Sequence, residues 1–129
     1  MSLESTIRAM LINGTTINLV PDARVTHGYR LQDTALPAIT FEVTSDERTT
    51  VKATQRAAEI EIRSIAVEAV DALAIAAQVR SAITTGTFDG MQVKAVIFGS
   101  TVLQPAAVGE GDEAEPAEAV TTATIHYEE

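Results

Sequence analysis

The sequence predicts an α+β domain in which two helices pack on a mostly antiparallel sheet of about four to five strands. Two segments show the spacing of apolar residues that is typical of amphipathic helices, and at least three others alternate apolar and polar residues with period two. Trp and Cys are absent and aromatic residues make up 4% of the 129 residues. The core must therefore be aliphatic, and no disulfide or thiolate metal site can stabilise it.

The first helix is predicted over Leu3–Ile12. Ser2 is a suitable N-cap for it, and Asn13-Gly14 is a typical helix stop. The apolar residues that share one stripe of this helix are Leu3, Ile7, Met10 and Leu11. Beyond it the pattern is weaker: a short helical turn is predicted over Thr16–Val20, and an extended segment over Arg24–Tyr29.

Alternation begins at Ile39, where three apolar residues face one way and three polar residues the other, which predicts a half-buried strand. A polar connection is predicted over Ser45–Thr54. A second alternating strand follows, with Ile60 and Ile62 on its apolar face. Its opposite face carries Glu59, Glu61 and Arg63.

The main helix is predicted over Val67–Ile83, and Gly86 follows its end. Its many alanines allow close approach to a sheet or to a neighbouring subunit, but they also simply have high helix propensity, so both interpretations stay open. Asp89-Gly90 predicts a tight turn before a strand over Met91–Leu103, which we expect to be covered on both faces because apolar residues occupy both alternating sets. The last strand is predicted over Ala119–Tyr127.

The length predicts a single domain over residues 1–129, with an acidic loop or insertion at residues 105–118. The net charge is −9, which argues against binding of nucleic acid through clustered cations. More than half of the excess charge lies in that loop, on Glu110, Asp112, Glu113, Glu115 and Glu118. The N-terminus lacks the features of a signal peptide, and no apolar run approaches the roughly 20 residues that span a bilayer.

No pattern of residues predicts catalysis, a cofactor or a metal. His27 and His126 are isolated from each other, and phosphate-binding and nucleophile-elbow motifs are absent. Glu59 and Glu61 could act as a pair of carboxylates, but a solvated strand face is the better interpretation. Arg48, Lys52 and Arg56 form a local basic cluster, which either pairs with carboxylates of another subunit or keeps a long connection soluble.

The order of elements resembles the tail-completion, or tail-terminator, proteins of long-tailed bacteriophages and gene transfer agents across nearly the whole chain. The residues that carry the resemblance are the opening Met1-Ser2-Leu3-Glu4, then Arg24-Val25, the stretch from Ala35 to Phe41 with its apolar-Pro step, the strand around Ile60 and Ile62 that runs into the Ala-rich helix, and the closing Tyr127. The acidic segment from Pro105 to Glu118 is longer than the family usually shows.

The resemblance implies a non-enzymatic virion subunit without a cofactor, made in the host cytoplasm, that forms a hexameric ring on the head-proximal end of the tail tube. Such a ring ends tube polymerisation and provides the head-attachment surface. Its partners are copies of itself, the tail tube protein and the head-tail connector or adaptor proteins, while DNA passes through without specific binding. The alternatives are a head-completion or adaptor protein of the neck, and a small ligand-binding or regulatory α+β domain with a polar pocket.

Two hypotheses follow for the charged residues. A ring closes through two different complementary surfaces, so the opposite charges of the basic cluster and of Glu59 and Glu61 suggest that they meet across the subunit boundary. The candidate contacts are Arg48, Lys52, Arg56, Glu59 and Glu61. The acidic loop either lines the lumen and repels DNA phosphates over about 10 Å, or faces outward and serves solubility.

Overall fold

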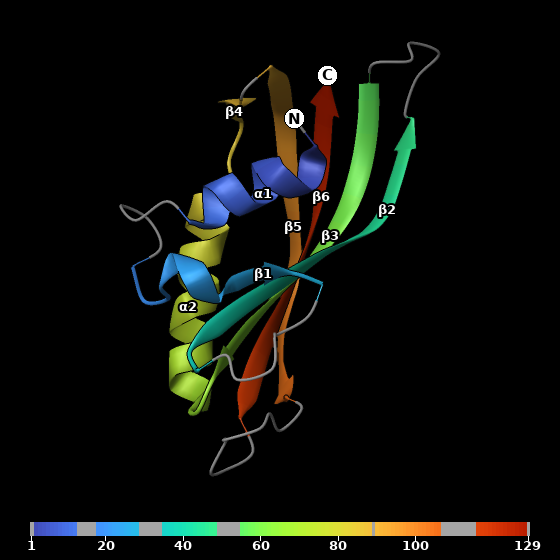
Figure 1. Cartoon of the computed structure of the whole chain (residues 1–129). Coiled ribbons are helices and arrows are strands. Elements are labelled where there is room, and N and C mark those ends of the chain that lie inside the picture. The colour runs from blue at the N-terminus through green and yellow to red at the C-terminus, as the bar shows by residue number, and fades with distance from the viewer. Residues whose placement is uncertain are drawn as a thin grey trace.

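The computed structural model describes residues 2–12, 18–28, 35–48, 55–88, 90–106 and 116–128. In chain order the elements are α1 (Leu3–Leu11), the 3-10 turn η1 (Asp22–Arg24), β1 (Val25–His27), β2 (Ala38–Arg48), β3 (Gln55–Ala66), α2 (Ala69–Ala82), β4 (Gly86–Phe88), β5 (Met91–Pro105) and β6 (Ala117–Glu128). The strands form one sheet in the order β1-β2-β3-β6-β5-β4. Its long strands twist strongly about one another (Figure 1).

The prediction of a mostly antiparallel sheet of about four to five strands is wrong. Within the described residues the sheet has six strands and is mixed, because β1 pairs with β2 in parallel, with Val25 opposite Ile39. The strand β4 and the place of β1 in the sheet were not predicted, because a three-residue strand is too short to show a period of two. The two helices and the general α+β character agree with the prediction.

Both helices cover the same face of the sheet (Figure 1). The Ser2 side chain caps α1 by accepting a hydrogen bond from the backbone N–H of Ser5 at 3.1 Å. The predicted stripe of α1 is confirmed, since all four of its residues are buried. In α2 the buried residues are Ala72, Ile75, Ala76, Val79 and Ala82. Small side chains at three of these positions let α2 lie close to β3 and β6.

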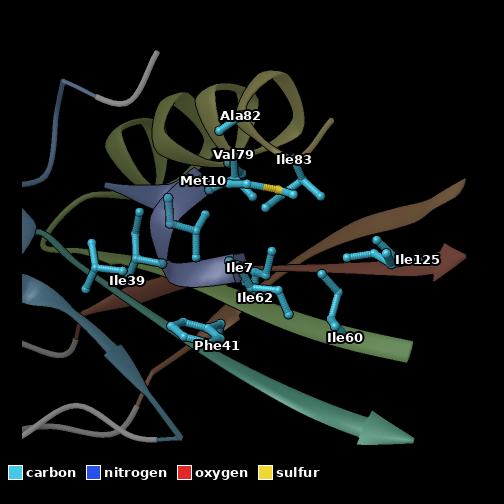
Figure 2. Packing of buried hydrophobic residues seen from close by; sticks show 14 of the residues in the cluster. Ile7, Met10, Ile39, Phe41, Ile60, Ile62, Val79, Ala82, Ile83 and Ile125 are labelled. Carbon is cyan, nitrogen blue, oxygen red and sulfur yellow. The ribbon is translucent and has the colours of Figure 1, made fainter. Parts of the chain in front are cut away.

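The core fills the space between the helices and the sheet. Figure 2 shows Ile7 of α1 and Val79 of α2 above the apolar face to which Phe41 and Ile62 belong. Phe41 and Ile62 are directly opposite each other in the register of β2 and β3. Full burial of one such aliphatic side chain contributes about 1.5–3 kcal/mol, so packing against this face accounts for the position of both helices.

Two details of the strands differ from the expectation. The predicted polar connection begins too early, since β2 continues to Arg48. The prediction that β5 is covered on both faces is also wrong. Ile97 is 59% exposed, and it points to the side of the sheet opposite the helices. We call that side, which bears Glu59, Arg63 and Ile97 among others, the helix-free face.

Candidate assembly surfaces

Arg56 is bound within its own subunit, on the face of the sheet that carries the helices. Its Nε donates a hydrogen bond to Asp46 Oδ1 at 3.1 Å. The pKa of Arg56 is raised, chiefly by that hydrogen bond and then by the charge of Asp46. The hydroxyl of Tyr127 donates to Asp46 Oδ2 at 2.6 Å. One carboxylate therefore holds two side chains, and the Arg56 charge is already compensated.

The other members of the predicted basic cluster and most of the acidic loop cannot be placed in the same way. Arg48 ends β2, but its side chain, like Lys52, is outside the described residues. The acidic residues that are also outside them are Glu110, Asp112, Glu113 and Glu115. Their roles stay predictions. Residues 105–118 are not all loop, since Pro105 ends β5 and β6 begins at Ala117.

Glu118 belongs to β6 and lies in an ion-pair network on the helix-free face. It is only 6% exposed, and its Oε1 accepts hydrogen bonds from Arg63 Nη1 and from Gln104 Nε2, both at 2.6 Å. Arg63 also pairs with Glu61. This network ties β3, β6 and β5 together. Glu61 and Glu118 are thus engaged within the subunit.

Glu59 differs from these two carboxylates. It is exposed, and among the described residues its side chain has no hydrogen-bond or ion-pair partner. It lines a groove of about 370 Å³ that crosses four strands on the helix-free face. The residues that line the groove are Thr44, Glu59, Ile60, Glu61, Ile97, Phe98, Gly99, Thr122, Ala123 and Thr124. The groove therefore combines a free carboxylate, three hydroxyls and exposed aliphatic surface.

Glu42 adds a further carboxylate beside the groove, and it was not among the predicted contact residues. It is exposed and directly opposite Glu61 in the register of β2 and β3. Like charges in that position repel, and Arg63 relieves the repulsion for Glu61 alone. The period-two alternation of the strand already put Glu42 on the polar face, but only the strand register shows that it lies beside Glu61.

The outer side of α2 is a second candidate surface. Val70 and Leu73 are 68% and 45% exposed, and Ala74 and Ala77 lie with them away from the sheet. Leu73 is seven residues before Arg80, which contacts β5 through Thr101 Oγ1 at 3.1 Å. Residues seven apart share a side of a helix, so Leu73 lies at the margin of this outer side that is nearest β5. The alanine-rich helix α2 thus carries apolar side chains both on its buried side and on its exposed side.

The described residues contain no group of three or more metal-ligating side chains. His27 stacks on Phe41 with ring centroids 5.2 Å apart, and His126 is on β6, opposite Ala57. Across the described ranges, no helix has both the length and the apolar character needed to cross a membrane.

Comparisons with known proteins identify a fold neighbour. No protein-family model matches the chain, and no curated protein matches it in sequence. Among solved structures, a chain from a structure described as "Virion of native gene transfer agent (GTA) particle" has a TM-score of 0.62 to this chain. The match covers 97% of this chain and 95% of that chain, with 15% sequence identity. The similarity shows that the two chains share a fold over nearly their whole lengths.

Proposed function

We propose that the chain is a non-enzymatic structural subunit of a virion, which forms a ring at the head-proximal end of the tail tube. The observation that carries the proposal is the fold shared along nearly the whole chain with a component of a gene transfer agent virion. Such a ring ends tube polymerisation and provides the surface to which the filled head attaches. Its partners are the tail tube protein and the head-tail connector proteins.

The surfaces of the subunit support an assembling role. A ring of identical subunits requires two different surfaces that fit each other. The outer side of α2, with Val70 and Leu73, is apolar, whereas the helix-free face on the other side of the sheet carries Glu42 and Glu59. Surfaces of such different chemistry suit contacts with different neighbours. The resemblance in sequence pattern implies six subunits.

The net charge of −9 supports a ring through which DNA moves without binding. Carboxylates near the lumen repel phosphates over about 10 Å at ordinary salt, and so they keep the DNA from adhering to the wall. The subunit then contributes to a passage to which DNA does not adhere, and it binds other virion proteins through its outer surfaces.

The experiment that tests this function examines particles assembled without the chain by electron microscopy. Tails of irregular length that lack heads are the expected result, because tube growth then has no stop. Tails of normal length beside empty or leaking heads would contradict termination, and they would indicate a head-completion or adaptor protein instead. Turnover of a small molecule by the purified chain would contradict the non-enzymatic role.

A further inference from the structure

The groove on the helix-free face has a charge that its own subunit leaves uncompensated. The described residues place two cations on this face, and both are paired: Arg63 with Glu61 and Glu118, and Lys94 with Glu128 at 2.9 Å. Glu59 and the neighbouring Glu42 have no partner within the described part of the chain. The unbalanced charge is therefore negative, and it is at the groove.

The shape of the groove favours a long cationic side chain. Ile97 is 59% exposed and lines the groove together with Glu59. Lysine and arginine bury their methylene stems on apolar surface while their charged ends remain near water or a carboxylate. The hydroxyls of Thr122 and Thr124, which also line the groove, can bind a backbone beside such a side chain. An extended segment with Lys or Arg and few carboxylates fits this surface.

The chain itself contains such a segment. From Arg48 to Ala58 the sequence has no carboxylate, and the connection between β2 and β3 carries Lys52. Within one copy, Glu59 is four residues beyond Gln55, the first residue of β3, which corresponds to about 13 Å along the strand. Each copy of the chain thus carries both a negative groove and a connection without carboxylates.

We propose that the groove binds the β2–β3 connection of a second copy, with Lys52 against Glu59 and Ile97. The proposal rests on the proposed function, since it names the contact between ring subunits. Groove and connection are different surfaces, so the contact repeats head to tail and closes into a ring when the rotation permits. Arg56 takes no part because Asp46 holds it, and Arg48 is the second cation of the contact.

Because the chain has no cysteine, crosslinking can test this contact directly. The double variant Lys52→Cys/Glu59→Cys is treated with a short bis-maleimide crosslinker, both as purified protein at high concentration and within assembled particles. A ladder longer than a dimer is expected, because each copy then carries both halves of the contact. Each single variant can give at most a dimer. The control Lys52→Cys/Glu68→Cys, with its second cysteine before α2, should give no ladder, and a ladder as strong as that of the test variant would overturn the proposal.

Reversal of the charges of Lys52 and Glu59 provides a second, independent test of the contact. Glu59→Lys and Lys52→Glu should each weaken self-association about tenfold or more, measured by sedimentation velocity. A mixture of the two variants should recover it, because each groove then meets an opposite charge on the other variant. Glu68→Lys, the same charge change on another surface, should change association less than twofold. Equal weakening by Glu68→Lys, or no recovery in the mixture, would overturn the proposal.

The crosslinking result and the location of the chain in particles together distinguish failure of the groove contact from failure of the proposed virion role. If the chain forms the crosslinked ladder but is absent from particles, the proposed contact is supported and the virion role is contradicted. If the chain is located at the neck but gives no crosslinked ladder in solution or on particles, the virion role is supported and the proposed contact is contradicted.

Discussion

The hydroxyl of Tyr127 donates a hydrogen bond to Asp46 Oδ2 at 2.6 Å, and so joins β6 to β2 across β3, which lies between them. Ala58 of β3, opposite Asp46, is buried, and its single methyl group leaves space for the ring. Tyr127 itself is only 2% exposed. This hydrogen bond fixes the far end of β2, the strand that leads into the connection with Lys52.

Tyr127→Phe removes that hydrogen bond and keeps the ring. We expect the free energy of unfolding to fall by about 1–3 kcal/mol, because Asp46 loses a donor in a partly buried place. Denaturant unfolding measures this change. In an Asp46→Ala background the same substitution should cost much less, and an equal cost in both backgrounds would show that the hydroxyl acts elsewhere.

Arg63→Met leaves Glu118 without its cation. We expect a loss of about 1–3 kcal/mol in the free energy of unfolding, since the Glu118 side chain is only 8% exposed while Arg63 is 38% exposed. The double variant Arg63→Met/Glu118→Met should recover most of this loss, because no unpaired buried charge remains. Thermal and denaturant unfolding of the three proteins provide the measurement. A double variant as unstable as the single one would contradict the explanation by charge burial.

Ser64→Ala tests a buried hydroxyl. Ser64 is fully buried in β3, and within the described residues its Oγ has no hydrogen-bond partner. We expect the free energy of unfolding to stay the same or to rise by up to about 1 kcal/mol. Thr121→Val is the contrast, because the Thr121 hydroxyl is 3.2 Å from that of Thr101, so its removal should destabilise the protein. A clear loss of stability in Ser64→Ala would indicate a hydrogen bond to that hydroxyl.

Neutralisation of the acidic segment tests whether its charge serves DNA passage. The variant changes Glu110, Asp112, Glu113 and Glu115 to their amides and retains Glu118, which Arg63 holds in the sheet. We expect slower DNA ejection from particles and unchanged unfolding of the purified chain. Unchanged ejection would assign these four carboxylates to solubility.

The long elements were predictable because each carries several turns or alternations of its pattern. The stripe of α1, the apolar face around Ile60 and Ile62, and the alanine-rich α2 all appear where the sequence places them. The parallel pairing of β1 depends on a contact between Val25 and Ile39 that no local pattern encodes. The exposure of Ile97 was mispredicted because apolar residues on both sides of a strand do not show which side the helices cover.

Sequence reasoning identified charged residues but not their partners. Arg56 and Glu61 were predicted as intersubunit contacts, and the structure shows both in ion pairs within the subunit. Glu118 was grouped with the acidic loop by its neighbours in sequence, although its side chain pairs with Arg63 on β3. Arg63 and Glu118 are 55 residues apart in sequence, and Arg56 and Asp46 are on different strands, so these two pairs follow from the pairing of the strands, which no local pattern predicts. Arg63 and Glu61 are two residues apart on β3, so the period of two already places them on one face.

The most direct test of the proposed virion role is a single-particle reconstruction of the particles made by cells that encode the chain. We expect density for a ring of six copies between the tail tube and the head, with the fold described above fitting each copy. Particles with a complete neck and no density for this chain at the head-proximal end of the tail would contradict the account.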